Sequence, residues 1–280
     1  MNQILLIDKE EGYTSFDVCH KLKRKFNTKK IGHTGTLDPN ATGLLMVMIN
    51  KSCKILPYIK HAKKTYRASM RFGLKTDTKD IWGQIIEEQM INEPTIDQIK
   101  QVLLSFMGPQ LQIPPMTSAI KVNGKKLYEL QRANIDYQPE PRKIEIYELN
   151  FIKYDQELYF EVTCSAGTYI RSLCEDIALK LNNLGTMTSL VRTKIDDFDV
   201  KDAKKLDDII NDHYQGLNNE EILSKYYPLI EYHDLKDIIN GKRISLDCNQ
   251  DIVMITHDHK IVAAYEKEKD QIYKSKRGLW

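Results

Sequence analysis

The sequence lacks the features that mark membrane, secreted and repeat proteins. Its 280 residues contain no uninterrupted apolar run near the roughly 20 residues that cross a bilayer. The N-terminus has no basic segment followed by a long apolar one, so we expect no signal peptide. There is no internal repeat and no low-complexity segment. We therefore expect a globular protein that makes no membrane contact.

Cysteine is scarce and dispersed. The five cysteines lie at positions 19, 53, 164, 174 and 248 and never show C-x-x-C spacing. An odd, unclustered set of thiols is typical of a reducing compartment and provides no framework for a metal ion. We expect a cytoplasmic location and no metal site.

Charge is balanced overall but uneven along the chain. The net charge is +2, yet residues 1–76 contain 15 Lys and Arg against 5 Asp and Glu, whereas residues 77–280 contain 26 against 34. A surplus of +10 in the first quarter suits a polyanionic partner. A solvated basic surface explains the same charges about equally well.

A glycine-rich segment lies within this basic region. Residues 31–43 read I-G-H-T-G-T-L-D-P-N-A-T-G, and the three glycines with Pro39 exclude a helix. We predict a loop that is held by its own side chains, with Asp38 at its centre. Loops on a rigid scaffold often carry chemistry. An Asp before Pro also shapes turns. On this pattern alone, the alternative is that Asp38 only stabilises the turn.

Hydrophobic patterning predicts strands and helices in an irregular order. Apolar and polar side chains alternate clearly over Thr65–Phe72, which places Tyr66 on the inward, apolar face of a strand. On this pattern alone, Tyr66 could simply be an aromatic residue of the core. Because strict strand–helix alternation is absent, we predict an α+β fold with a largely antiparallel sheet. The predicted strands are 3–9, 43–49, 65–72, 143–154, 157–164 and 186–195, and the predicted helices begin at 14, 52, 95 and 170. Thr14, with Asp17 three residues later, gives the first helix a capping-box-like start.

The remaining segments give weaker signals. We predict a polar loop over 74–85, a hairpin turn at Asn123-Gly124 and a polar helical region over 206–226. After Pro228, short strands are predicted at 238–244, 251–257 and 260–267, forming an all-β module of about fifty residues. Such a module is too small to be stable without the main domain.

Arg171 lies in the first turn of the helix that follows Gly167-Thr168, outside its apolar stripe. On spacing alone, a surface ion pair with Glu175 four residues later is the simplest interpretation. A cation is not favoured by the dipole at that end of a helix, so a buried carboxylate is the other explanation.

The glycine segment carries a specific resemblance. The run G-H-T-G-T-L-D-P-N-A-T-G-L-L at 32–45 resembles, nearly without a break, the catalytic-loop motif of the TruB family of pseudouridine synthases. Further family-like motifs follow in the family's order, and the resemblance covers about residues 3–195. They are L-I-D-K at 6–9, K-T-Y-R at 64–67, T-D-T-K-D at 76–80, I-P-P-M at 113–116, G-K-K-L-Y at 124–128, C-S-A-G-T-Y-I-R at 164–171 and L-V-R-T at 190–193. Glu10 departs from the family's usual Pro.

The resemblance implies a reaction and its catalytic residues. A uridine in RNA is isomerised to pseudouridine, and no cofactor is expected. Asp38 is the expected nucleophile, attacking either C6 of the base or C1′ of the ribose. Arg171 is expected to keep that carboxylate ionised. Tyr66 is expected to stack on the flipped base and to handle the proton at C5.

The resemblance also implies a substrate and the residues that bind it. The expected substrate is the T arm of tRNA, at uridine 55, with no guide RNA and with the protein acting as a monomer. His33 is expected to fill the space that the flipped base leaves, and Tyr169 to form a pocket wall. The full set of expected substrate-binding residues is His33, Tyr169, Lys9, Asp80, Leu190, Lys121 and Lys125.

By the same resemblance, the fold is a pseudouridine synthase fold: a mixed, mainly antiparallel sheet flanked by helices, with a small β-rich PUA-like module. We assign residues 1–229 to the catalytic domain and 230–280 to a short PUA-like RNA-binding module. Two alternative functions remain open. One is a non-catalytic RNA-binding or tRNA-folding protein of this fold, and the other is a guide-RNA-dependent relative.

Overall fold

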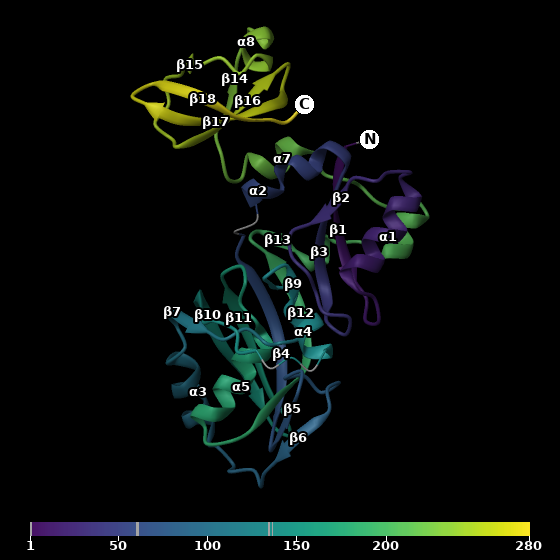
Figure 1. Ribbon diagram of the computed structural model, residues 1–280, viewed down its shortest axis with the longest axis vertical. Helices are drawn as coiled ribbons and strands as arrows, with labels where there is room; N and C mark the ends of the chain where they lie inside the picture. Colours follow the sequence, from purple (N-terminus) through teal and green to yellow (C-terminus); the bar gives the residue numbers. More distant parts are fainter. Residues whose placement is uncertain (1, 60–61, 134, 136) are drawn as a thin grey trace. The chain divides into compact units, whose positions relative to one another are not determined.

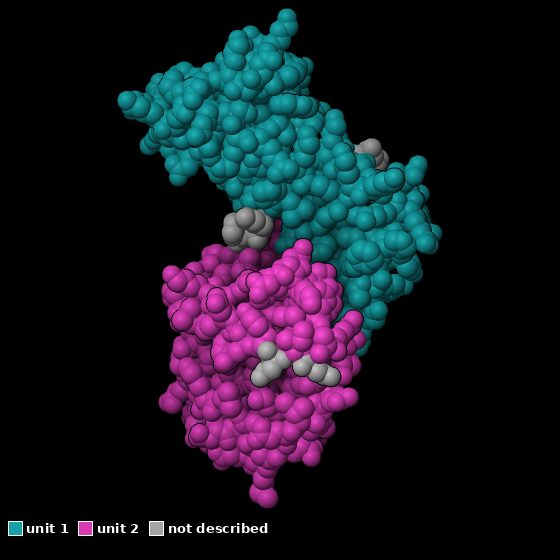
Figure 2. All heavy atoms as spheres, in the orientation of Figure 1, with its two compact units in different colours: residues 1–39, 45–60, 202–280 teal, residues 40–44, 61–201 magenta. Residues whose placement is uncertain are grey.

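The computed structural model describes residues 2–59, 62–133, 135 and 137–280, and Figure 1 labels its elements. The chain forms two compact units, coloured separately in Figure 2. Unit 1 comprises residues 1–39, 45–60 and 202–280, and unit 2 comprises residues 40–44 and 61–201. Neither unit is one continuous segment of the sequence.

Unit 2 is built on an antiparallel sheet. Its strands are hydrogen-bonded in the order β12-β4-β11-β10-β7, and every neighbouring pair in this series is antiparallel. The first residues of β3 add a short parallel pairing with β12. The predicted mixed, mainly antiparallel sheet with flanking helices is therefore confirmed. The bounds are β4 (Lys64–Phe72), β5 (Leu74–Thr76), β6 (Ile85–Glu88), α3 (Ile96–Leu104), β7 (Gly108–Gln112), β8 (Lys121–Val122), β9 (Lys125–Lys126), α4 (Leu127–Arg132), β10 (Arg142–Tyr154), β11 (Leu158–Cys164), α5 (Ile170–Lys180), β12 (Gly185–Ile195), β13 (Phe198–Asp199) and η2 (Val200–Asp202).

The sheet of unit 2 has a covered face and an open face. Helix α5 packs on β12 and β4, and α3 packs on β10. The buried face of α5 contributes Leu173, Ile177 and Ala178 to the core. Gly185 lies so close to this helix that an added Cβ would be 2.4 Å from the Cβ of Ala178. This close packing holds the C-terminal half of α5 against the sheet.

Unit 1 contains a second group of elements around the N-terminal strand. Thr14 and Asp17 form the capping box that the sequence predicts at the start of α1. Strand β1 pairs with β3, and its other edge is hydrogen-bonded to residues far along the chain, at Lys204 and Leu217. The bounds are β1 (Gln3–Lys9), α1 (Ser15–Lys25), β2 (Ile31–His33), β3 (Thr42–Ile49), η1 (Asn50–Ile55), α2 (Leu56–Ile59), α6 (Leu206–Ile210) and α7 (Asn219–Leu223).

The C-terminal part of unit 1 is the PUA-like β-module. Its strands follow the order β14-β16-β17-β18-β15, around a core that includes Tyr265 and Tyr273, both fully buried. The Tyr273 hydroxyl donates to the carbonyls of Cys248 and Gln250, which fixes the loop before β16. The bounds are β14 (Leu229–Glu231), α8 (Leu235–Ile239), β15 (Ile244–Ser245), β16 (Ile252–His257), β17 (Lys260–Lys269) and β18 (Ile272–Gly278).

Three predictions of local structure were wrong. Of the predicted strand 238–244, only Ile244 lies in a strand, at the start of β15. The Asp234 side chain accepts bonds from the amides of Lys236 and Asp237 and starts the short helix α8, which includes residues 238 and 239. The predicted loop over 74–85 contains β5 and leads into β6, which pair as a two-stranded hairpin. The helical region over 206–226 is two short helices separated by an extended segment that pairs with β1 at Leu217.

Within the described residues, no helix is long and apolar enough to cross a membrane.

Candidate active site

The loop that carries Asp38 is fixed on both sides of that residue. On one side, the buried ammonium of Lys9 donates to the carbonyls of Glu10, Tyr13 and Pro39, at 2.6–3.0 Å. On the other side, the Ser15 hydroxyl accepts a bond from the amide of Leu37 at 2.9 Å and donates to its carbonyl at 3.2 Å. Asp38 is half-buried between these two anchored neighbours. Its carboxylate is therefore held in a preorganised loop.

The last residues of the same loop, 40–43, belong to unit 2 and contact β12 there. Gly43, at the start of β3, has a φ of +97°, and an added Cβ would lie 2.3 Å from the carbonyl oxygen of Arg192. Only glycine permits this approach. The buried Arg192 guanidinium then donates from Nε to the carbonyl of Leu44 at 2.7 Å. The third glycine of the 31–43 segment is thus explained by its contact with β12.

Tyr66 lies on the covered face of β4, as the alternation predicts, and is 7% exposed. The Arg192 guanidinium carbon is 6.0 Å from the centre of its ring. Lys64, two residues earlier on the same strand, is also buried. Burial lowers the pKa of Lys64 to about 8, with a further lowering from the nearby charge of Arg192. Tyr66 therefore lies near one buried guanidinium, on a strand that carries a second buried cation.

Arg171 is buried, and the prediction of a surface ion pair between Arg171 and Glu175 is wrong. Its guanidinium donates from Nη1 to the carbonyl of Thr78 at 2.8 Å and from Nη2 to the carbonyl of Thr117 at 3.0 Å, and it also contacts the Thr117 hydroxyl. Glu175 is paired instead with Lys75 and Lys79. The side chain of Arg171 points to these loops because the start of α5 is packed against them.

Asp80 lies beside Arg171. Its Oδ2 is 3.6 Å from Nη1 of Arg171, and its Oδ1 accepts a bond from the Thr78 hydroxyl at 2.7 Å. The turn closes tightly, since a Cβ at Gly83 would lie 2.2 Å from that same hydroxyl oxygen. The T-D-T-K-D segment with Gly83 therefore forms a compact turn that presents one carboxylate to the guanidinium.

Tyr169 is the N-cap residue of α5 and is held by a residue that the sequence did not single out. The buried side chain of Gln112 accepts a bond from the Tyr169 amide at 2.8 Å and donates one to the Tyr169 carbonyl at 3.0 Å. Gln112, Thr117 and Arg192 were all missed as site residues. Arg192 belongs to a family-like motif, which was an available signal, whereas nothing local distinguishes Gln112 or Thr117.

The other predicted residues are spread over both units. His33 ends β2 in unit 1, and Leu190 is buried in β12 opposite Ala68. Lys121 and Lys125 are exposed on the hairpin of β8 and β9, whose turn at Asn123-Gly124 has the positive φ angles predicted for it. The contacts of these four residues with RNA stay predictions.

The predicted catalytic residues also divide between the units. Asp38 belongs to unit 1, and Tyr66 and Arg171 belong to unit 2. The pairing of Asp38 with Arg171 stays a prediction, as do the catalytic roles of all three residues.

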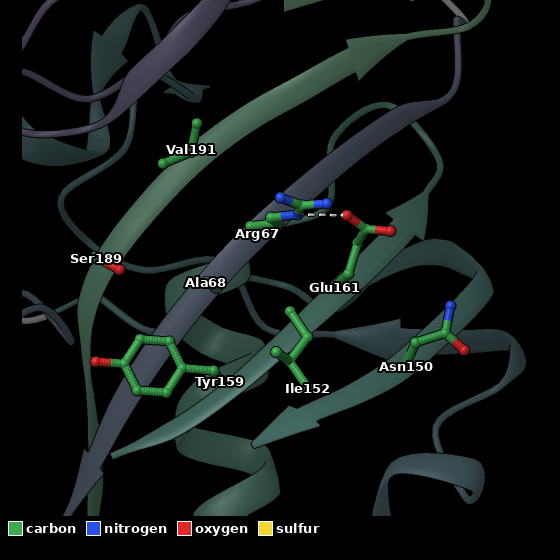
Figure 3. Close-up of a pocket in the computed structure, with 8 residues that line it drawn as sticks. All are labelled: Arg67, Ala68, Asn150, Ile152, Tyr159, Glu161, Ser189 and Val191. Carbon is green, nitrogen blue, oxygen red and sulfur yellow. Dashed lines mark hydrogen bonds and ion pairs between the residues drawn. The ribbon is translucent and has the colours of Figure 1, made fainter. Parts of the chain in front are cut away.

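A pocket lies on the open face of the unit 2 sheet (Figure 3). The Arg67 guanidinium, next to Tyr66 in sequence but on the other face, is bonded to Glu161 at 2.8 Å. Of the described residues that line this pocket, none is a predicted site residue. They are Arg67, Ala68, Asn150, Ile152, Tyr159, Glu161, Ser189 and Val191.

No group of three or more metal-ligating His, Cys, Asp or Glu side chains is found in the part of the chain that the structure describes.

Two solved structures share the fold of this chain. The chain is similar to a solved structure titled "Crystal Structure of a Cbf5-Nop10-Gar1 Complex", with a TM-score of 0.75 and 22% identity, covering 99% of this chain and 85% of that chain. It is similarly close to the structure titled "Structure of H/ACA RNP bound to a substrate RNA containing 2'-deoxyuridine", with a TM-score of 0.74 and 20% identity, covering 99% and 85%. At these identities the likeness establishes the fold.

Sequence comparison places the chain more narrowly. The TruB family pseudouridylate synthase (N terminal domain) model matches residues 23–170. A protein of Alkaliphilus oremlandii (strain OhILAs), named tRNA pseudouridine synthase B, is 39% identical over 96% of this chain and 91% of its own length. A protein of Mycoplasma mycoides subsp. mycoides SC with the same name is 37% identical over 98% and 96%. The chain belongs to the TruB family of pseudouridine synthases.

Proposed function

We propose that the protein isomerises uridine 55 in the T loop of tRNA to pseudouridine, without a guide RNA. Family membership over nearly the full chain carries this proposal, because the relatives at 35–43% identity are named tRNA pseudouridine synthase B. The H/ACA RNP and Cbf5-Nop10-Gar1 structures are only 20–22% identical to this chain, and the likeness to them concerns the fold alone. The proposal includes a cytoplasmic monomer.

The proposed chemistry is a rearrangement of one nucleotide. The C1′–N1 bond breaks, the base turns, and a C1′–C5 bond forms. The proton on C5 is lost and N1 gains one, so the composition of the uridine is unchanged and no external oxidant or reductant is consumed. Asp38 is the proposed nucleophile, and its anchored position between Leu37 and Pro39 supports that role because a fixed carboxylate loses little freedom on attack.

Arg171 is the proposed counter-ion of Asp38. A buried guanidinium stabilises a carboxylate in its ionised, nucleophilic form. The bonds that Arg171 donates to the carbonyls of Thr78 and Thr117 support the role, because they fix the direction of the guanidinium before substrate arrives. Tyr66 is proposed to stack on the flipped base. Its neighbour Arg192 supports this role, because it lies where β12 pairs with the start of β3, directly after the Asp38 loop.

The test is a turnover assay with purified protein and an unmodified tRNA transcript, with no guide RNA added. We expect pseudouridine at position 55, mapped by chemical probing, and none in a matched transcript that carries cytidine there. Asp38→Asn should fold and bind tRNA while losing nearly all turnover. Pseudouridine formed at a wild-type rate by Asp38→Asn would overturn the nucleophile, and absence of product with the wild-type protein would overturn the function.

A further inference from the structure

The side-chain carboxamide of Gln112 makes two hydrogen bonds to Tyr169, the N-cap residue of α5, and so closes a hydrogen-bonded ring. Gln112 is the last residue of β7, and it is 4% exposed. Its Oε1 accepts from the Tyr169 amide at 2.8 Å, and its Nε2 donates to the carbonyl of the same residue at 3.0 Å. A side-chain amide here imitates the pairing of a neighbouring strand. Both peptide groups of Tyr169 are therefore held by one buried side chain.

The start of α5 depends on this ring. The Tyr169 side chain provides no helix cap within the described part of the chain, and Gly167, two residues earlier, has a positive φ of +92°. The conformation of the turn is therefore not fixed by a local cap of the usual kind. Gln112 supplies, from 57 positions away, two hydrogen bonds to the N-cap residue of this helix.

Residues 112–117, here called the strap, continue these contacts along the first turn of α5. The Ser172 hydroxyl donates to the carbonyl of Ile113 at 3.0 Å, and the Arg171 guanidinium donates to the carbonyl of Thr117 at 3.0 Å. The strap thus contacts three of the first four residues from the N-cap. Gln112 is the only member whose side chain binds the α5 backbone among these described contacts.

We propose that Gln112 is a positioning residue for the reaction, because its carboxamide fixes the backbone from which Tyr169 and Arg171 extend. This inference rests on the proposed function, in which Arg171 is the counter-ion of Asp38, and on the expected place of Tyr169 in the wall of the pocket. Gln112 need not touch RNA to have this effect. Loss of its two bonds rotates the start of the helix and moves the guanidinium away from the position that turnover requires.

The ring needs one donor and one acceptor, and that requirement makes the inference testable. In Gln112→Glu, an ionised carboxylate still accepts from the Tyr169 amide but faces the Tyr169 carbonyl with negative charge. A protonated carboxyl restores both bonds, because its O–H donates as the amide does. Burial favours the neutral, protonated carboxyl over the carboxylate. The protonated fraction then grows as pH falls. The variant should therefore be defective at high pH and recover at low pH.

The experiment measures kcat and KM on unmodified tRNA from about pH 8.5 to about pH 5.5 for wild type and Gln112→Glu. Relative to wild type at the same pH, kcat should fall by about 10- to 100-fold at the upper end, with KM little changed, and should recover toward the lower end. Gln110→Glu is the matched control on the same strand, where the carboxamide donates to the Phe106 carbonyl. It should stay near wild type throughout.

Gln112→Met serves if Gln112→Glu fails to fold, because it keeps the side-chain length and removes both bonds. Its kcat should fall similarly and to the same degree at every pH. Wild-type kcat in Gln112→Met, a pH-independent defect in folded Gln112→Glu, or the same pH response in Gln110→Glu would each overturn the inference. Absence of product with wild type would overturn the proposed function itself, and this inference with it.

Discussion

Lys64 is a buried ammonium on the strand that carries Tyr66. Its pKa is lowered to about 8 because burial penalises the charged form. Below pH 8 the lysine is protonated in both the folded and the unfolded protein, so the folded state bears the full cost of burying the charge. Between pH 8 and the unfolded pKa of 10.5, only the unfolded chain keeps the proton. The contribution of Lys64 to the free energy of unfolding therefore rises with pH in that window.

We expect Lys64→Met to increase the free energy of unfolding at pH 7 by roughly 3 kcal/mol, and this gain should shrink as pH rises from 8 to 10.5. Urea unfolding at pH 7 and pH 10 measures both values. The neighbouring exposed Lys63 gives the control, because Lys63→Met should change stability by no more than about 0.5 kcal/mol. A less stable Lys64→Met at pH 7 would contradict the cost assigned to the buried charge.

Arg171 makes a second residue-scale prediction. Its planar guanidinium bonds two carbonyls at once, at Thr78 and Thr117, and a lysine ammonium cannot span both in the same geometry. Arg171→Lys should therefore lower kcat more than it weakens tRNA binding. Arg171→Ala should also lower the free energy of unfolding by about 3–5 kcal/mol, because Asp80 loses its buried partner.

Turnover assays, filter binding and urea unfolding measure these three effects of the Arg171 variants. Thr117→Val is the milder control, because it removes the hydroxyl contact and keeps the carbonyl bond. Wild-type turnover by Arg171→Lys would show that the fork geometry of the guanidinium is dispensable.

At the scale of elements, the close pairing of β3 with β12 depends on Gly43. Gly43 and Gly167 have similar φ angles, +97° and +92°, but a Cβ at Gly167 meets open space, whereas one at Gly43 collides with Arg192. We expect Gly167→Ala to cost about 1–2 kcal/mol from backbone strain alone. Gly43→Ala should cost about 1–3 kcal/mol more, because the two strands must separate. Thermal or urea unfolding of both variants measures the difference, and equal losses would contradict the collision.

Local sequence predicted those elements whose signals lie within a few residues. The capping box at Thr14, the alternation of β4 and the turn at Asn123-Gly124 all depend on near neighbours, and all three are confirmed. Helix α8 was missed although Asp234 is a normal helix cap, because its hydrophobic pair, Ile238-Ile239, also suited a strand.

The site could be predicted only in part, for a related reason. Motifs named Asp38, Tyr66 and Arg171, but the contacts that hold them come from distant segments. The partners of Arg171 are 93 and 54 positions away, and a spacing of four residues pointed wrongly to Glu175. Pairing that depends on how strands are ordered in the sheet is not encoded in the spacing of a single segment.

For the molecule as a whole, the uneven charge predicts how binding responds to salt. The +10 surplus of residues 1–76 suits release of counterions from tRNA phosphates. We expect log K to fall linearly with log salt concentration, with a slope of about −0.7 to −0.9 per phosphate contacted. Filter binding with Asp38→Asn, which should not turn over its substrate, measures this. A flat response would contradict the basic region as the docking surface.

The outer edge of β1 has a consequence for synthesis of the chain on the ribosome. Ile4 exchanges two hydrogen bonds with Leu217, and the Asp8 amide donates to the carbonyl of Lys204. These partners are made about 200 residues later, which corresponds to roughly 10 to 40 s of translation. During that time the edge is a template for pairing with other chains. Slow codons within residues 61–201 should therefore reduce the yield of folded protein more than the same codons placed after Leu217.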